Sequence, residues 1–101
     1  DAGAELAMGS DAPVSPVDPW GAVRVAVERT GDHRPGWHME HALTVSQALL
    51  SSTRQIAKVV EGGPSDVIAV GPNPFDLSGK TLAGLTSDLT IVGGEVTASA
   101  I

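Results

Sequence analysis

One aspartate is placed where a catalytic carboxylate could work. Asp11 follows a short apolar run, residues 4–8, and lies in the turn-forming stretch 9–13 (Gly-Ser-Asp-Ala-Pro). A carboxylate just past the C-terminal end of a strand is held by a rigid element and faces an open loop, which suits a metal ligand or a general base. An aspartate in such a turn can also be only a turn former that bonds its own backbone. The local pattern, taken alone, favours the structural interpretation.

Three histidines, His33, His38 and His41, lie close together in the chain. The run His38-Met-Glu-His41 suggests a metal site, but its spacing differs from the known motifs. A zinc-protease helix needs histidines one turn apart with glutamate beside the first, and the deaminase motif needs a later cysteine pair. The chain has no cysteine. We therefore expect ordinary histidines in a solvated loop, with weak adventitious nickel or zinc binding.

Other common catalytic patterns are missing from the sequence. None of the serines lies in a Gly-x-Ser-x-Gly elbow. The pairs Gly62-Gly63 and Gly93-Gly94 are not followed by the Lys-Ser or Lys-Thr of a phosphate-binding loop. The sequence therefore supports neither serine hydrolase chemistry nor nucleotide binding.

Composition narrows the range of folds and partners. The 101 residues include one Phe, two Trp and no Tyr, so Val, Leu, Ile and Ala must build a modest core for one small domain. A formal net charge of −6 disfavours binding to nucleic acid and to anionic membranes. No apolar run reaches the length of a membrane span. We expect a cytoplasmic protein, because cysteine and a signal-peptide pattern are also missing.

The N-terminal part of the chain predicts one strand and one helix. Residues 4–8 predict a short strand, and the prolines of residues 14–19 predict an extended connection. Asp18 before Pro19 is the pattern of an N-cap followed by a helix-starting proline. A helix of about three turns is therefore expected from Pro19 to near Arg29.

A second, longer helix is predicted after a loop. Residues 30–41 lack any apolar period and predict the loop. Thr44 and Gln47 have the spacing of a capping box, and apolar residues then follow at helical spacing. We expect a helix over residues 45–60 that is ended by the glycines and proline of residues 61–64.

The C-terminal part predicts a small antiparallel sheet. Residues 66–70 predict a strand, 71–74 a turn, and 75–87 an irregular passage with one helical turn near residues 80–83. Two β-branched runs, residues 89–92 and 95–98, flank Gly93-Gly94. A Gly-Gly link between such runs predicts a hairpin.

Three stretches share their order and spacing with the end of a known superfamily. Residues 1–14, which contain Gly-Ser-Asp, are similar to a last barrel strand and its loop. Residues 43–49, Leu-Thr-Val-Ser-Gln-Ala-Leu, are similar to the helix that follows such a barrel. The closing strands and their Val-Gly-Gly-x-Val hairpin are matched by residues 66–70, 73–76 and 90–96. Together they resemble the C-terminal end of the amidohydrolase superfamily, in particular the amidohydrolase-3 type.

The resemblance implies a parent enzyme with a metal-dependent β/α barrel and a small β-sandwich built from both chain ends. Such enzymes use a metal-activated water to hydrolyse non-peptide carbon-nitrogen bonds of small amide-type substrates. In that family the aspartate after the last strand binds the metal, commonly zinc, and carries a proton to the leaving nitrogen. Position by position, this aspartate is Asp11, and the remaining ligands would lie upstream. Because a catalytic zinc needs about three protein ligands, we expect the isolated chain to hold no metal and to be inactive.

The expected fold class is therefore mixed α/β, with two main helices and a small antiparallel sheet. By the resemblance, residues 1–61 are the end of the barrel and residues 62–101 are the C-terminal strands of the composite β-sandwich. One passage departs from the family: between Val60 and Asp66 the chain has only Glu-Gly-Gly-Pro-Ser, where the family usually has a longer passage. The shortening would fit the loss of a sandwich strand or a divergent, inactive member.

Two interpretations of function remain open. If the chain is a fragment of such an enzyme, its strands lack their natural partners, and we expect self-association through the exposed edges of residues 67–70 and 89–98. The alternative is a small acidic interaction or structural module without catalysis, in which Asp11 is a turn residue.

Overall fold

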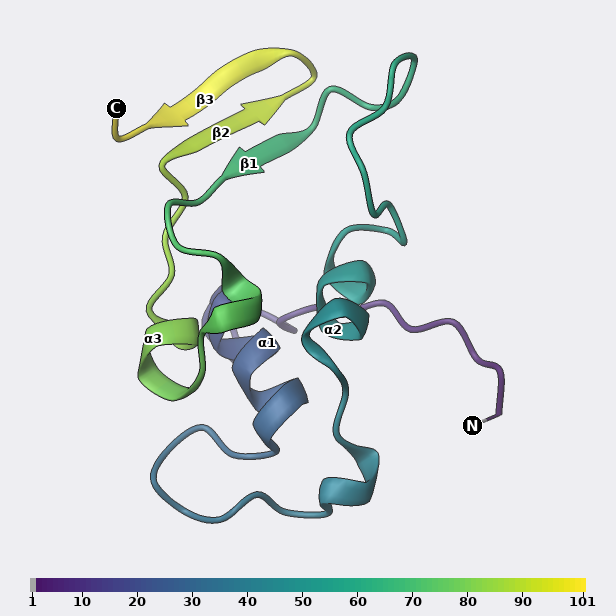
Figure 1. Ribbon diagram of the computed structural model, residues 1–101, viewed down its shortest axis with the longest axis vertical. Helices are drawn as coiled ribbons and strands as arrows, with labels where there is room; N and C mark the ends of the chain where they lie inside the picture. Colours follow the sequence, from purple (N-terminus) through teal and green to yellow (C-terminus); the bar gives the residue numbers. More distant parts are fainter. Residues whose placement is uncertain (1) are drawn as a thin grey trace.

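The computed structural model describes residues 2–101 and confirms the mixed α/β class. Three α-helices pack together at one end of the molecule, and a three-stranded antiparallel sheet lies at the other (Figure 1). In chain order the elements are α1 (Pro19–Glu28), the 3-10 turn η1 (Met39–His41), α2 (Val45–Ser52), β1 (Val67–Ala69), the 3-10 turn η2 (Pro74–Asp76), α3 (Gly79–Ala83), β2 (Leu89–Val92) and β3 (Glu95–Ser99).

The predicted strand over residues 4–8 is wrong. Residues 2–10 form no strand, and their backbone is held by the C-terminal part of α2 and the residues after it. The Met8 N–H donates to the Ser51 carbonyl oxygen at 2.9 Å, and Gln55 Nε2 donates to the Leu6 carbonyl oxygen at 2.9 Å. A strand needs a neighbouring strand for its ladder, and none of the described residues supplies one here.

Helix α1 begins and ends as the sequence predicts. The Asp18 carboxylate accepts a hydrogen bond from the Gly21 N–H at 3.0 Å, and Pro19 takes the first helical position. The helix stops at Arg29, whose N–H makes the last helical hydrogen bond, to the Val25 carbonyl oxygen, and whose backbone then turns left-handed (φ 57°). Arg29 is also the first residue of the loop that leads to His38, Glu40 and His41.

Helix α2 has the predicted start but only half of the predicted length. The Thr44 hydroxyl accepts from the Gln47 N–H at 3.1 Å, and the Gln47 side-chain oxygen accepts from the Thr44 N–H at 2.9 Å. The prediction that the helix continues to residue 60 is wrong, since Arg54 and Gln55 adopt left-handed backbone angles. The apolar side chains of residues 53–60 are exposed, and an amphipathic pattern without a packing partner does not sustain a helix.

The predicted sheet is confirmed, including its turn. The strand order is β1-β2-β3, with Val67 opposite Ile91 and Val92 opposite Glu95. Gly93 and Gly94 both have positive φ, 58° and 83°, as a two-residue type I′ turn requires. The register between β2 and β3 shifts after Thr90, which marks a β-bulge.

Helix α3 confirms the predicted turn near residues 80–83 and joins the helical group. The Glu28 carboxylate, at the end of α1, accepts a hydrogen bond from the Gly79 N–H at the start of α3. The buried core combines side chains from α1, α2 and the α3 region. Among the described residues, the buried apolar side chains are Val23, Ala48, Leu82 and Leu85.

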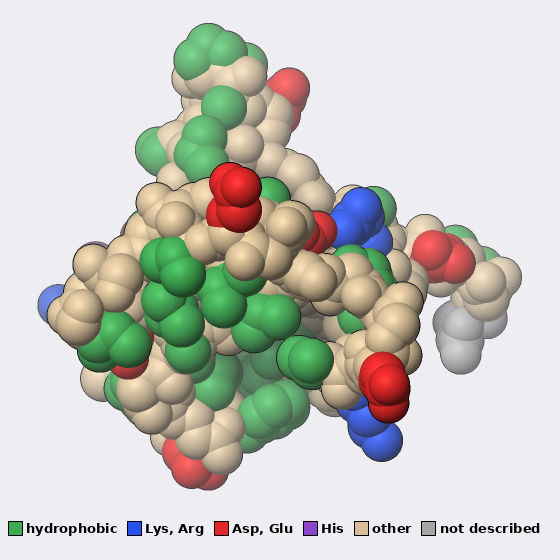
Figure 2. All heavy atoms as spheres, turned by 90° about the horizontal axis from the view of Figure 1, so that it is seen from above, with side chains coloured by type: hydrophobic (Ala, Val, Ile, Leu, Met, Phe, Trp, Pro, Cys, Tyr) green, Lys and Arg blue, Asp and Glu red, His purple; other side chains and the backbone are tan. Residues whose placement is uncertain are grey.

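This core is small, and much apolar surface stays outside it. The radius of gyration, 14.4 Å, exceeds the roughly 13 Å of a compact chain of this length. Figure 2 shows hydrophobic side chains gathered on the face seen from the sheet end. A groove of about 670 Å³ between α2, the segment after it and the sheet has mainly apolar walls. Its lining includes Trp20, Leu49, Ile56, Ile68, Phe75 and Ile91.

No helix in residues 2–101 is long and apolar enough to cross a membrane. The proposed division of the chain at residues 61 and 62 stays a prediction.

Candidate functional site

Asp11 lies in a tight turn that the backbone closes. The Val14 N–H donates to the Asp11 carbonyl oxygen at 2.9 Å, and the Ala12 N–H donates to the Ser10 hydroxyl at 3.3 Å. Asp11 itself has a left-handed backbone with φ 53°. Its carboxylate is exposed and makes no hydrogen bond with the described residues. The side chain that bonds the turn is therefore Ser10, and the Asp11 carboxylate is available to a ligand.

The described residues around Asp11 do not complete a metal centre. A catalytic zinc site needs about three protein ligands, and Asp11 supplies one. Within residues 2–101, the group of side chains close enough to share a metal ion lies elsewhere, at His38, Glu40 and His41. The metal and catalytic roles predicted for Asp11 stay predictions, and no chemical step follows from this carboxylate alone.

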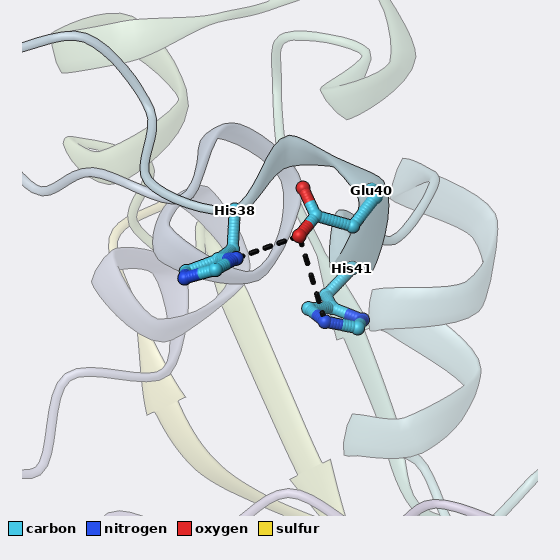
Figure 3. Close-up of side chains that lie close together, drawn as sticks. All are labelled: His38, Glu40 and His41. Atoms are coloured by element: carbon cyan, nitrogen blue, oxygen red, sulfur yellow. Dashed lines mark hydrogen bonds and ion pairs between the residues drawn. The ribbon is translucent and has the colours of Figure 1, made fainter.

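His38, Glu40 and His41 form the second candidate site, which we call the His-Glu-His cluster (Figure 3). The Glu40 carboxylate extends between the two imidazole rings. Its Oε1 lies 2.6 Å from His38 Nδ1 and 3.8 Å from His41 Nε2. One ligand atom from each residue lies within 4.8 Å of the other two. The predicted solvated loop is confirmed in its exposure, but two of its histidines, His38 and His41, lie on either side of one carboxylate.

Local backbone geometry brings these side chains together. His38 has left-handed angles, φ 54° and ψ 58°, which reverse the chain just before η1. The 3-10 turn is closed by two hydrogen bonds, from the His41 N–H to the His38 carbonyl oxygen and from the Ala42 N–H to that of Met39. The first of these bonds joins the two histidines of the cluster, and the imidazole ring centres of His38 and His41 lie 5.9 Å apart. The three side chains are therefore brought together by a tight turn and not by an α-helix.

Both ends of this segment are attached to α1. The Trp37 N–H donates to the Arg29 carbonyl oxygen at 3.0 Å, and Arg29 Nε donates back to the Trp37 carbonyl oxygen at 3.1 Å. On the other side, the Leu43 N–H donates to the Ala26 carbonyl oxygen at 2.9 Å. The cluster thus lies on a loop whose entry and exit are hydrogen-bonded to α1 and its C-cap residue.

The electrostatics of the cluster favour an ionised carboxylate. The hydrogen bond with His38 lowers the pKa of the Glu40 carboxyl below its usual value, and a backbone hydrogen bond adds to the effect. The positive charge of Arg29, and that of His41 when it is protonated, act in the same direction. The side chains of His38, Glu40 and His41 are 47%, 62% and 69% exposed, so water reaches all three.

Comparison with known proteins gives one informative similarity. The chain is 29% identical over 103 aligned positions to a protein of Bacillus subtilis (strain 168) named "Putative amidohydrolase YtcJ". The alignment covers 89% of this chain but only 20% of that relative, so the chain spans about a fifth of its length. No family model matches the chain, and no solved structure matches it. The similarity agrees with the resemblance found in the sequence and supports a hydrolase-like origin for this chain.

Proposed function

We propose that this chain is the C-terminal part of a larger amidohydrolase-like enzyme that hydrolyses non-peptide carbon-nitrogen bonds of small amide-type substrates. The observation that carries the proposal is the similarity, over 89% of the chain, to the protein named "Putative amidohydrolase YtcJ". Because that similarity covers a fifth of the relative, the barrel and most of its ligands would belong to sequence beyond these residues.

The geometry of Asp11 supports a ligand role within this proposal. Its carboxylate is exposed and free of hydrogen bonds to the described residues, while Ser10 and the backbone hold the turn. An ionised carboxylate is purely an acceptor, so it can bind a cation or take a proton from water. When bound, a divalent metal such as zinc would supply Lewis acidity and a water of lowered pKa. Asp11 would hold one coordination position and accept the proton.

The N-terminal segment also fits the proposal. Residues 2–10 form no regular element, and the Met8 and Leu6 backbone is hydrogen-bonded to Ser51 of α2 and to Gln55 just after it. An extended segment becomes a strand once a neighbouring strand supplies the ladder. In the parent protein we expect that neighbour to be another barrel strand, which would place Asp11 at the strand's C-terminal end.

The experiment compares Asp11→Asn with wild type in the protein expressed from its complete reading frame. We expect wild type to carry bound metal and to hydrolyse members of an amide panel, and Asp11→Asn to lose at least about 100-fold in kcat/KM. Asp76→Asn is the matched control, since Asp76 is an exposed aspartate in η2. The proposal fails if Asp11→Asn and Asp76→Asn keep equal metal content and equal activity.

A second candidate function is an acidic interaction module, and the exposed apolar surface favours it. Val59, Val96 and Ile101 are 79%, 61% and 90% exposed, and such side chains gain from contact with another protein surface. In this case Asp11 serves the turn only. A complete gene product of about this length, without metal and without amidase activity, would support the module over the enzyme.

A further inference from the structure

We propose that the His-Glu-His cluster is a zinc-type metal site on the surface of this protein. The site uses His38 Nδ1, Glu40 Oε1 and His41 Nε2 as ligands. It does not depend on the proposed hydrolase activity, because none of its ligands is Asp11.

The distances suit a single small cation after minor rotation of exposed side chains. Zinc binds imidazole nitrogen and carboxylate oxygen at about 2.0 to 2.2 Å, so neighbouring ligands of a tetrahedral site lie about 3.4 Å apart. The carboxylate oxygen of Glu40 lies 2.6 Å from His38 and 3.8 Å from His41, on either side of that value. All three ligand atoms lie within 4.8 Å of one another. The three side chains are exposed, so no tightly packed core restricts their rotation.

The backbone of the segment is already ordered without a metal, so metal binding would cost little further backbone entropy. His38 is held in left-handed geometry, and two hydrogen bonds close η1 around it. The paired Trp37 and Arg29 bonds and the Leu43 bond to Ala26 fix the loop at both ends. Only side-chain rotation remains to be restricted on binding, so a ligand set from one short segment can still bind usefully.

The donor set selects the class of metal. Two imidazoles with one carboxylate match zinc and its first-row neighbours, whereas magnesium and calcium prefer sites made of oxygen ligands. Three protein ligands leave one position of a tetrahedral zinc open to water. A metal on His38 Nδ1 would take the place of the hydrogen bond between His38 and Glu40, and the neutral imidazole would carry its proton on Nε2.

The competing explanation is that His38 and Glu40 form only a surface ion pair. A His38–Glu40 ion pair would form whether or not His41 lay nearby. Such exposed pairs contribute little to the stability of the fold. A metal site instead requires all three side chains. His33 offers the matched control, because it is an exposed histidine of the same loop that lies outside the cluster.

Zinc alone is the probe, and the protein is the product of the complete reading frame in an Asp11→Asn background. We expect His38→Gln and His41→Gln to weaken zinc binding at least tenfold, as judged by competition with a chromophoric chelator. His33→Gln should bind as tightly as its parent. In EDTA all variants should share one thermal midpoint, which excludes misfolding as the cause.

Two results would overturn the proposal. One is equal loss in His33→Gln and the cluster variants, which means adventitious binding by surface histidines. The other is unchanged affinity in both His38→Gln and His41→Gln, which leaves an ion pair only. The Asp11→Asn background separates this outcome from the proposed hydrolase, since an error about Asp11 leaves the comparison among histidine variants intact.

Discussion

At the scale of single residues, the loop after α1 contains a carboxylate with a strongly altered acidity. Arg34 Nε donates to both oxygens of Asp32 at 3.0 and 2.9 Å, and the Arg34 N–H donates to the same carboxylate at 2.9 Å. These hydrogen bonds, first the side-chain bond from Arg34, lower the pKa of Asp32 to about 2. The Thr30 hydroxyl adds another hydrogen bond to Asp32. The group thus stays charged in nearly all conditions.

We expect Arg34→Gln to return the pKa of Asp32 toward its ordinary value of 3.8. Because the pKa is depressed in the folded chain, the ion pair stabilises the fold above pH 3.8, and this contribution is lost as the pH falls through about 2. Side-chain carbon NMR during an acid titration measures the shift. Arg54→Gln, which removes the separate ion pair with Asp66, should leave the Asp32 titration unchanged.

The site residues differ in how far the sequence could reveal them. The resemblance to the superfamily singled out Asp11, whereas its residue type and turn alone favoured a structural role, and its role as a ligand stays a prediction. The geometry of the His-Glu-His cluster was not found. Its spacing matches no known helical metal-binding motif, and the left-handed backbone of His38 has no reliable signal in the sequence of a non-glycine residue. A test of the motif against a 3-10 turn could have revealed it.

At the scale of elements, starts of helices were predictable and their ends less so. The caps at Asp18 and Thr44 are local, so the sequence shows them directly. The end of α2 depends on whether an apolar face finds a partner, which the pattern of residues 53–60 alone does not show. Residues 4–8 do not form the predicted strand for a similar reason. A strand needs a neighbouring strand, and the local pattern does not show whether one is present.

Packing of α1 gives a direct stability test with a control on the same helix. Val23 is 2% exposed and Val25 is 44% exposed. Val23→Ala should lower the free energy of unfolding by about 2 kcal/mol, because it removes buried methyl groups and leaves a cavity. Val25→Ala should change it by no more than about 0.5 kcal/mol. Urea denaturation followed by circular dichroism measures both, and equal effects would mean that the helices do not pack as described.

At the scale of the whole molecule, the sheet has two edges that no other described strand pairs with. Strands β1 and β3 form its two edges, and every residue of β3 is exposed. An unpaired edge with apolar residues can pair with another chain. Self-association through the edges therefore remains our expectation for this chain, and in the parent protein other strands would cover the same edges.

We predict that the 101-residue chain shows a concentration-dependent mass above that of a monomer in light scattering. Val96→Lys places a charge on the β3 edge and should weaken this association at least about tenfold. Val17→Lys makes the same change at an exposed valine outside the sheet and should have no effect. A strictly monomeric wild-type chain at high concentration would contradict the prediction.

The long exposed segment between α2 and β1 has a further consequence for how the protein tolerates being cut. Residues 53–66 include Arg54 and Lys58, two exposed residues of the types after which trypsin cleaves. The core, however, draws on both sides of this segment, with Val23 and Ala48 before it and Leu82 and Leu85 after it. The Glu28 carboxylate also binds the Gly79 N–H across the same gap. Two peptides produced by a nick there would complement each other and remain one assembled particle.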